Sequence, residues 1–444
     1  MIRQAKLGEF LAKRSRGIVP ASTPDETFEL YSVPAFEAKR PEVVTGGQIG
    51  SNKQIVDPGT VLLCKINPRI NRAWVVGSFT KHQKIASTEW ITFLPHADLE
   101  PRYLAHYLSR KEIRDHLAAN ASGVGGSLMR VKASTVEGLP LPLPNVDQQR
   151  RIVAEIDKQF SRLDEAVANL KRVKANLKRY KAAVLKAAVE GRLVPTESER
   201  ARREGRDFET GEQLLLRILE ARRSQWTGKG KYKAPIAPSR DDTLPPLPDG
   251  WTWASVDQLL ANVTDGDHQP PPQTDAGVPF LVISNVRSGK IDFESTRFVG
   301  SNYFESIDES RRPKSGDLLY TLVGSYGIVV PVKTDRKFCI QRHIAILRPH
   351  RESPVEYLAL ALASNVVFNQ ATACATGTAQ LTVPLSGLRA LAVPLPPAAE
   401  QARIVKEVDR RLSISAEVAA EVAVSLQRAR GLREATLRTS FRSV

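Results

Sequence analysis

The sequence predicts an α+β protein in which two related α/β domains are separated by two long helices that form an antiparallel coiled coil. Three observations predict this fold: a long internal repeat, an unbroken helical stretch after each copy of a proline-rich motif, and short β-rich runs mixed with short helices before each copy. The chain has 444 residues, too many for one small domain, and its 42% hydrophobic and 25% charged residues are typical of globular proteins. We therefore expect several packed domains.

The repeat is clearest at the proline-rich motif. Residues 139–157 read LPLPLPNVDQQRRIVAEID, and residues 391–409 read LAVPLPPAAEQARIVKEVD. No insertion separates the copies farther on, because the matched pairs keep one spacing: Pro142 with Pro394, Gln149 with Gln401, and Leu185 with Leu437. Upstream the match is looser but keeps its order, and the small-residue loop at 122–123 parallels that at 376–377. One half of the chain therefore predicts the architecture of the other.

A helical stretch with coiled-coil spacing follows each motif. Residues 147–190 contain no proline or glycine and place apolar residues three or four apart: Ile152, Ile156, Phe160, Leu163, Val167, Leu170, Val173, Leu177, Tyr180 and Val184. The second stretch keeps Ile404, Val408, Leu412, Val418, Val422, Leu426 and Leu432. A helix of about 44 residues is roughly 65 Å long, more than a globular core needs. We expect the two helices to pair antiparallel and to relate the two domains by a pseudo-two-fold axis.

These observations divide the chain into five segments. The first α/β domain is expected at 1–145, the first long helix at 146–192, a linker at 193–247, the second domain at 248–396 and the second long helix at 397–444. The linker is rich in Pro, Gly and Lys and contains one expected helix, at 212–223.

The charge of the chain points to a polyanionic partner. Sixty-four Lys and Arg against 48 Asp and Glu leave a formal charge of +16, which favours nucleic acid or an anionic membrane surface. The uncharged stretch at 318–332 is too short to span a bilayer, and the N-terminus lacks the apolar run of a signal peptide. We therefore expect a cytoplasmic protein without a membrane partner.

Catalytic and cofactor motifs are missing from the sequence. There is no GxxxxGK[ST] phosphate loop, no HExxH metal helix and no Asn/Asp-Pro-Pro-Tyr tetrad of the kind with which adenine methyltransferases hold a flipped base. Cys64, Cys339 and Cys374 lie far apart, and the seven histidines are scattered. We expect neither a metal site nor a bound cofactor in this chain.

Two alternatives remain open. Asp25, Glu37 and Lys39 fit the permissive spacing of a Mg²⁺-dependent endonuclease, which would make the chain a self-sufficient DNA enzyme. A coiled-coil scaffold for protein partners would explain the long helices, but it would leave the basic charge unexplained.

The proline-rich motifs resemble the conserved regions of Type I restriction–modification specificity subunits, and the resemblance covers essentially the whole chain. It implies that two target recognition domains each read one half of a bipartite, asymmetric DNA target, while the paired helices set the spacer. It also implies a non-catalytic chain that docks two methyltransferase subunits and, through them, restriction subunits. Those partners would use S-adenosylmethionine, ATP and Mg²⁺. The docking residues implied in the motifs are Gln149, Ile152, Val153, Glu400, Gln401, Ile404 and Val405.

DNA contacts require cations for phosphates and Arg, Asn, Gln or hydroxyl groups for base edges. In the first domain the candidates follow the strand-like run at 60–65 or lie by the glycine loop: Lys65, Asn67, Arg69, Arg72, Lys81, Lys84, Ser127 and Arg130. In the second domain they are Arg287, Ser325, Tyr326, Lys333, Lys337, Arg342, Thr378 and Gln380. The two sets differ, which is expected if the two half-sites differ.

Overall fold

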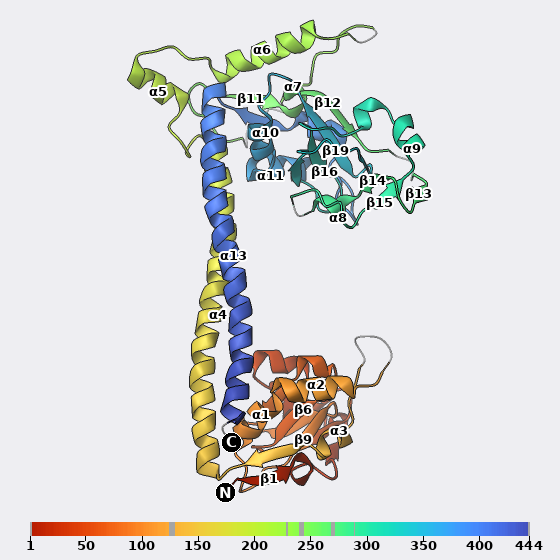
Figure 1. The fold of residues 1–444 in the computed structure, drawn as a ribbon, viewed down its shortest axis with the longest axis vertical. Coiled ribbons are helices and arrows are strands. Elements are labelled where there is room, and N and C mark those ends of the chain that lie inside the picture. The colour runs from red at the N-terminus through yellow and green to blue at the C-terminus, as the bar shows by residue number, and fades with distance from the viewer. Residues whose placement is uncertain are drawn as a thin grey trace. The chain divides into compact units, whose positions relative to one another are not determined.

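The computed structural model describes residues 2–123, 129–227, 230–238, 244–267, 271–287 and 289–442. It contains two compact units, one formed by Met1–Val173 with Glu421–Val444 and the other by Lys174–Ala420 (Figure 1). The long helices α4 (Val146–Val189) and α13 (Ala398–Arg442) therefore each contribute residues to both units. We call the compact unit that contains the N-terminus unit 1 and the other compact unit unit 2.

Unit 1 is built on short strands whose apolar residues are buried in three clusters, around Leu63, around Leu62 and around Phe28. A five-stranded sheet has the order β2 (Gly17–Ile18), β5 (Lys53–Ile55), β8 (Gln83–Ser87), β3 (Thr27–Tyr31), β4 (Glu42–Thr45). A three-stranded sheet places β6 (Val61–Cys64) between β7 (Ala73–Val75) and β9 (Trp90–Phe93), and β1 (Arg3–Lys6) pairs with β10 (Pro140–Leu143). All four residues of β6 are buried, as expected for a central strand made of a continuous apolar run. Helices α1 (Pro101–Leu108), α2 (Lys111–Ala119) and α3 (Ser134–Glu137) complete the domain.

Unit 2 repeats this plan, with its described strands grouped in sheets of four, four and two instead of five, three and two. One sheet has the order β12 (Leu260–Asp265), β19 (Ile344–Pro349), β16 (Leu318–Thr321), β17 (Val329–Pro331). The other has the order β13 (Gln273–Thr274), β15 (Arg297–Val299), β14 (Val278–Leu281), β18 (Cys339–Ile340), and β11 (Thr252–Ser255) pairs with β20 (Ala392–Leu395). The helices are α7 (Val256–Leu259), α8 (Ile283–Val286), α9 (Ser301–Ser306), α10 (Val355–Leu362), α11 (Asn365–Cys374) and α12 (Leu385–Ala390).

Equivalent contacts confirm the internal repeat. In unit 1 the Tyr103 hydroxyl donates to the Pro142 carbonyl (2.8 Å), and in unit 2 the Tyr357 hydroxyl donates to the Pro394 carbonyl (2.9 Å). The central strand has two antiparallel neighbours in each unit, β7 and β9 around β6 and β17 and β19 around β16. The two domains thus share one framework despite different lengths.

The long helices pair antiparallel in both units. In unit 1, Arg433 forms an ion pair with Asp164 (2.6 Å) and Thr436 donates to Gln159 (3.0 Å), so residue numbers rise along one helix as they fall along the other. In unit 2, Val184 and Ala188 of α4 share a core with Ile404 and Val408 of α13. The predicted coiled coil is confirmed.

Four predicted seam positions are exposed instead of buried, and Leu432 is the most exposed of them. Leu432 is 56% exposed, whereas Ala429 and Leu437 are 9% and 5% exposed, and Leu437 shares a core with Phe160 of α4. Buried Val422 and Ala429 lie seven residues apart, which continues a heptad, whereas Leu432, three residues farther on, is not buried. Val173, Tyr180 and Val418, also predicted in the seam, are exposed.

The segment predicted as a linker packs onto unit 2. The expected helix at 212–223 is confirmed as α6 (Gly211–Ser224), whose Leu214 and Ile218 are fully buried, and the sequence did not predict α5 (Glu197–Glu204). Both helices begin with a threonine capping box, Thr196 with Glu199 and Thr210 with Gln213. In the described part of the chain, no helix is long and apolar enough to cross a membrane.

Candidate nucleic-acid interface

Three segments meet at one edge of the central sheet in each unit. In unit 1 the loop after β6 contacts the turn before β9, where the Lys65 amide donates to the Glu89 carbonyl (2.9 Å). It also contacts a segment that precedes α3, where the Asn67 amide donates to the Met129 carbonyl (2.9 Å). We call residues 65–72, 88–89 and 129–131 loop edge 1.

Unit 2 forms the same edge from equivalent segments. The Leu322 amide donates to the His343 carbonyl (2.9 Å), and the Gly324 amide donates to the Leu381 carbonyl (2.9 Å). We call residues 323–327, 341–343 and 376–382 loop edge 2. Isolated bridges match as well, with Ser122 paired to Arg130 and Thr376 to Thr382, so the predicted correspondence of the two small-residue loops is confirmed.

Loop edge 1 brings together four predicted DNA contacts: Lys65, Asn67, Arg69 and Arg130. Asn67 has a left-handed backbone (φ 49°) and starts the 3-10 turn Pro68–Ile70, which leaves Arg69 exposed. The Lys65 ammonium donates to the Thr88 carbonyl (2.7 Å), and Arg130 forms an ion pair with Glu89 (2.9 Å). Predicted Ser127 lies outside the described residues.

Three other predicted contacts of unit 1 do not join this group: Arg72 ends the first segment of loop edge 1 but points into the fold, and Lys81 and Lys84 lie outside the edge. Arg72 is mostly buried with its guanidinium 3.6 Å from the Glu37 carboxylate, and the Lys84 ammonium lies 3.7 Å from the Glu29 carboxylate. Lys81 is exposed in the turn before β8. Arg72 and Lys84 are therefore held within the fold, whereas Lys81 is open to solvent.

The carboxylate beside Lys84 is fully buried. Burial raises the pKa of Glu29, but hydrogen bonds from the Thr80 hydroxyl and amide and from the Tyr31 hydroxyl outweigh that effect and leave the pKa below its ordinary value. Glu29 is therefore ionised at neutral pH and fixes Lys84 in place.

Loop edge 2 collects five predicted contacts: Ser325, Tyr326, Arg342, Thr378 and Gln380. The Thr321 hydroxyl donates to the Ser325 carbonyl (2.7 Å), and a Cβ at Gly324 would lie 2.9 Å from the Gln380 amide nitrogen. Phe368 of α11 and Leu381 flank this loop with 40% and 42% exposure. Sequence reasoning missed both, because Phe368 is distant in sequence and Leu381 is apolar.

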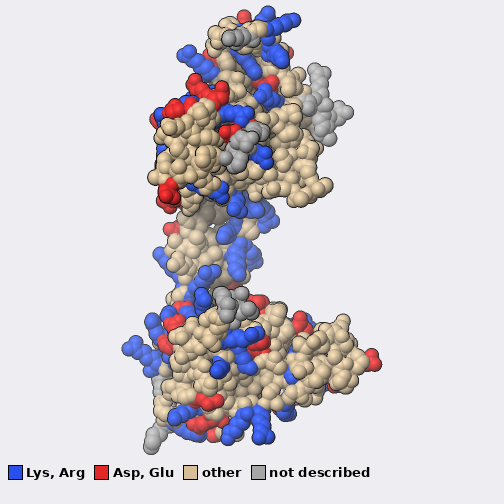
Figure 2. Space-filling model, turned by 90° about the vertical axis from the view of Figure 1, so that its right-hand side faces the viewer, with Lys and Arg blue, Asp and Glu red and all other residues tan. Residues whose placement is uncertain are grey.

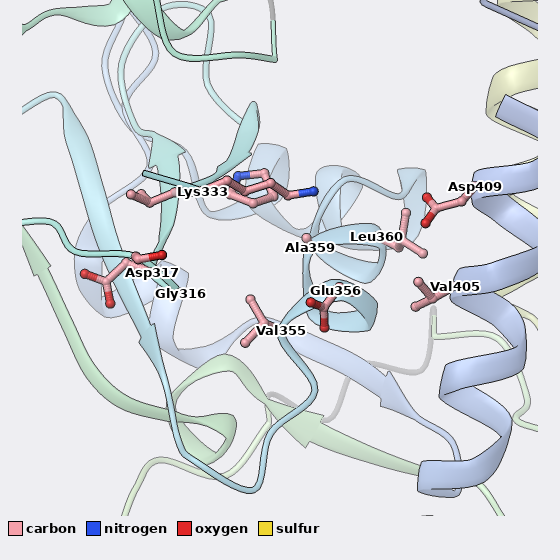
Figure 3. A pocket seen from close by; sticks show the side chains of 12 residues that line it. Gly316, Asp317, Lys333, Val355, Glu356, Ala359, Leu360, Val405 and Asp409 are labelled. Atoms are coloured by element: carbon pink, nitrogen blue, oxygen red, sulfur yellow. The ribbon is translucent and has the colours of Figure 1, made fainter. Parts of the chain in front are cut away.

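The remaining predicted cations of unit 2 lie away from loop edge 2. Exposed Arg287 ends α8, and the Lys337 ammonium lies 3.3 Å from the Glu305 carboxylate. Lys333 lines a cavity of about 510 Å³, together with Glu356 of α10 and Asp409 of α13 (Figure 3). Asp317 lines it as well, so the cavity is lined by three carboxylates and one ammonium, which does not favour a phosphate.

The residues expected to dock partners are largely buried inside their own units. The Gln149 side chain donates to the Asp98 and Pro144 carbonyls (2.8 Å each) and accepts from the Glu100 amide (2.8 Å). Val153, Gln401 and Ile404 are buried too, whereas Ile152 and Val405 are half-buried. In this structure the motif side chains fix the start of each helix and leave little surface for a partner.

In unit 2 the equivalent glutamine, Gln401, donates to the Pro396 carbonyl (2.6 Å), and the adjacent Glu400 makes further contacts. The Glu400 carboxylate accepts from the Glu197 amide (2.8 Å) and from the Trp251 indole (3.1 Å), which ties α13 to α5 and to the residue that precedes β11. Burial raises the pKa of Glu400 above its ordinary value. Arg403 adds an ion pair with Glu197 (2.6 Å).

The residues of the alternative nuclease form no metal site in the described structure. Asp25 lies in the turn before β3, Glu37 pairs with Arg72, and the Lys39 ammonium lies 3.1 Å from the centroid of the Phe36 ring. Burial lowers the pKa of Lys39 to about 8. Among the residues described, no group of three His, Cys, Asp or Glu could hold a metal ion.

Positive charge is spread over the face of the molecule that Figure 2 shows. Figure 2 shows Lys and Arg side chains over this face of each unit, with Asp and Glu among them. Such a distribution attracts polyanions over long range without defining one pocket.

The chain is similar to known proteins along most of its length. No family model matches it. It is 25% identical over 329 residues to the EcoBI specificity subunit of a Type I restriction enzyme from Escherichia coli, covering 73% of this chain and 62% of that protein. It is 22% identical over 348 residues to the EcoKI specificity subunit from Escherichia coli strain K12, covering 77% of this chain and 64% of that protein. The chain thus spans less than two thirds of the length of these relatives.

Solved structures share the fold. A chain from a study of complex assembly and conformational transition of the type I R-M system matches with a TM-score of 0.68 at 20% identity, covering 99% of this chain and 97% of that chain. The HsdS subunit from Thermoanaerobacter tengcongensis matches with a TM-score of 0.53 at 20% identity, covering 99% and 96%. At this identity the structures establish the fold, and the sequence relatives add the resemblance to specificity subunits.

Proposed function

We propose that this chain, which has the fold and the repeated sequence pattern of Type I restriction enzyme specificity subunits, is the non-catalytic DNA-recognition subunit of such a complex. Each loop edge reads one half of a bipartite, asymmetric target in double-stranded DNA. The observation that supports this most directly is the likeness of the two loop edges. Each is formed by three segments joined by equivalent backbone hydrogen bonds, but the side chains on the two edges differ. A shared frame with unlike contact residues suits two unlike half-sites.

The chemistry of the edges fits base recognition. Loop edge 1 presents Arg69, Arg130 and Asn67, which can read guanine and adenine edges or hold phosphates, whereas loop edge 2 presents mainly neutral groups such as Gln380 and Ser325. The remaining cations supply attraction that does not depend on sequence.

The paired helices set the spacer between the half-sites and carry the partners. Two methyltransferase subunits dock on the helices, and restriction subunits join through them. S-adenosylmethionine, ATP and Mg²⁺ belong to those partners. The buried motif residues, such as Gln149 and Glu400, hold each helix at a fixed angle to its domain and so preserve the spacing.

Methylation mapping tests this function. Adenine methylation is mapped in cells with and without the chain, and the purified chain with its methyltransferase subunits is then titrated with a duplex carrying the mapped target and with a scrambled duplex. We expect a two-part methylated motif that disappears with the gene, and tighter binding to the target duplex. Unchanged methylation and equal affinities would refute the proposal, and plasmid cleavage by the chain alone with Mg²⁺ would favour the nuclease instead.

A further inference from the structure

We infer that loop edge 2 reads an A·T base pair in the major groove, with Gln380 on the adenine and the apolar side chains of Phe368 and Leu381 on the thymine methyl group. This inference rests on the proposed DNA-recognition function and deepens it to one base pair. It adds Phe368 and Leu381, two residues that polarity alone does not select.

Phe368 is held rigidly although it is exposed. Its ring stacks on Tyr326 with centroids 5.4 Å apart and planes 13° apart, and the Tyr326 hydroxyl donates to the Thr372 hydroxyl (3.0 Å). Gly327 has a left-handed backbone (φ 82°), and a Cβ there would lie 2.6 Å from the Phe368 ring. The loop therefore requires glycine at this position so that the ring can pack against it.

A second large apolar side chain flanks the same loop. Leu381 is 42% exposed, and its carbonyl accepts a hydrogen bond from the Gly324 amide (2.9 Å). A single exposed apolar residue is ordinary, but two that flank one pre-formed loop offer a contact surface.

Gln380 supplies the polar half of the contact. A Cβ at Gly324 (φ 66°) would lie 2.9 Å from its amide nitrogen, so the glycine leaves room for this side chain beside the loop. The amide forms no hydrogen bond to the described residues and keeps both a donor and an acceptor available. A glutamine amide in this state can bind the N6 and N7 atoms of adenine, whose partner thymine places a methyl group in the same groove.

The charge of loop edge 2 favours an A·T pair over a G·C pair. Its segments contain one Lys or Arg, Arg342, whereas those of loop edge 1 contain four, Lys65, Arg69, Arg130 and the mostly buried Arg72. Guanine is read mostly by Arg or Lys, and apolar side chains discriminate through the thymine methyl group. DNA is favoured over a protein partner because the equivalent edge of unit 1 presents cations and Asn67 on the same backbone frame.

Deoxyuridine substitution tests the inference without changing base pairing. The chain with its methyltransferase subunits is titrated by fluorescence anisotropy with the mapped target, in which each thymine is replaced in turn by deoxyuridine, which lacks the methyl group. We expect about fourfold weaker binding at one or two positions of a single half-site, the value of one buried methyl group. In Phe368→Ala this penalty should disappear, because the contact is already lost. Gln380→Ala should weaken binding to the same half-site and reduce the preference for A·T over other base pairs at that position.

The control is Phe79→Ala, which removes another exposed phenylalanine (55%) from unit 1 and should retain the full deoxyuridine penalty. If no thymine position matters although the target is still preferred over scrambled DNA, the inference is wrong and the proposed function stands. If Phe368→Ala still binds the deoxyuridine duplex more weakly than the thymine duplex, or if it loses the methyltransferase subunits instead of DNA affinity, Phe368 and Leu381 do not read thymine. If the chain does not discriminate between the two duplexes, the proposed function itself fails.

Discussion

Phe441 joins the last turns of α13 to the domain of unit 1, so we predict that Phe441→Ala loosens unit 1 and leaves unit 2 unchanged. Its ring is 5% exposed and lies 5.0 Å from the Tyr103 ring and 5.4 Å from the Tyr107 ring. The Arg110 guanidinium lies 5.7 Å from the ring centroid. The side chain is therefore surrounded by α1 and by the residue that precedes α2.

The expected cost follows from this burial. Replacing a buried phenylalanine by alanine costs about 3–5 kcal/mol, because the lost transfer free energy is joined by the cost of a cavity. At about 3 kcal/mol the opened form of this helix end becomes roughly a hundredfold more populated.

Hydrogen exchange followed by mass spectrometry measures this opening by region. Peptides from 421–442 and from α1 should exchange faster in Phe441→Ala, while peptides covering β16 and β19 should not change. The control is Leu432→Ala on the same helix, which should alter stability by less than about 0.5 kcal/mol because Leu432 is 56% exposed. If Leu432→Ala loosens unit 1 as much as Phe441→Ala does, the observed seam is wrong and the seam predicted from sequence is right.

Three further perturbations test the buried charges and the loop edges. In urea unfolding, Glu29→Gln should lower the stability of unit 1 at pH 7 and reduce the loss of stability at acidic pH. The reason is that the lowered pKa of Glu29 contributes stability that is present above about pH 4.5 and is lost as the pH falls through the pKa of the folded state. The control Glu42→Gln, at an exposed position of β4, should change neither quantity. Arg348→Ala should destabilise unit 2 by about 3–5 kcal/mol in urea unfolding, because it leaves the buried Asp317 carboxylate, 2.9 Å from the guanidinium, without its partner, and a loss under 1 kcal/mol would contradict this. Arg69→Ala should weaken binding to the target by about 1–3 kcal/mol and to scrambled DNA far less, and equal losses in anisotropy titrations would reduce Arg69 to a phosphate contact.

Much of the fold follows from local pattern. The apolar run predicted as a strand at 60–65 is β6 (Val61–Cys64), because a continuous apolar run between turn residues suits a strand buried on both faces. The long helices follow from unbroken apolar spacing. Leu432 shows the limit of that reasoning, because spacing identifies a stripe but not which of two adjacent positions faces the partner helix.

The candidate site was harder to predict because exposure depends on distant partners. Arg72 and Lys84 have the right chemistry for DNA, but carboxylates at Glu37 and Glu29 hold them. Gln149 and Glu400 have the polarity of surface residues, and only the packing of the domain against its helix shows that both are buried. Nothing in the local sequence of α11 shows that Phe368 lies beside Gly327.

The duplication explains why the two loop edges could diverge. The three segments of each edge are joined mainly by backbone hydrogen bonds, such as Asn67 to Met129 in unit 1 and Gly324 to Leu381 in unit 2. Backbone bonds constrain the path of the chain but place few demands on side chains, apart from glycines where rings or amides approach closely. Equivalent turns therefore carry opposite charges, Glu89 in unit 1 and Arg342 in unit 2, on one frame. Side chains of the loop edges can thus change without loss of fold, whereas the buried motif residues that fix the helices cannot, and the proposed reading of two unlike half-sites by one subunit requires this division.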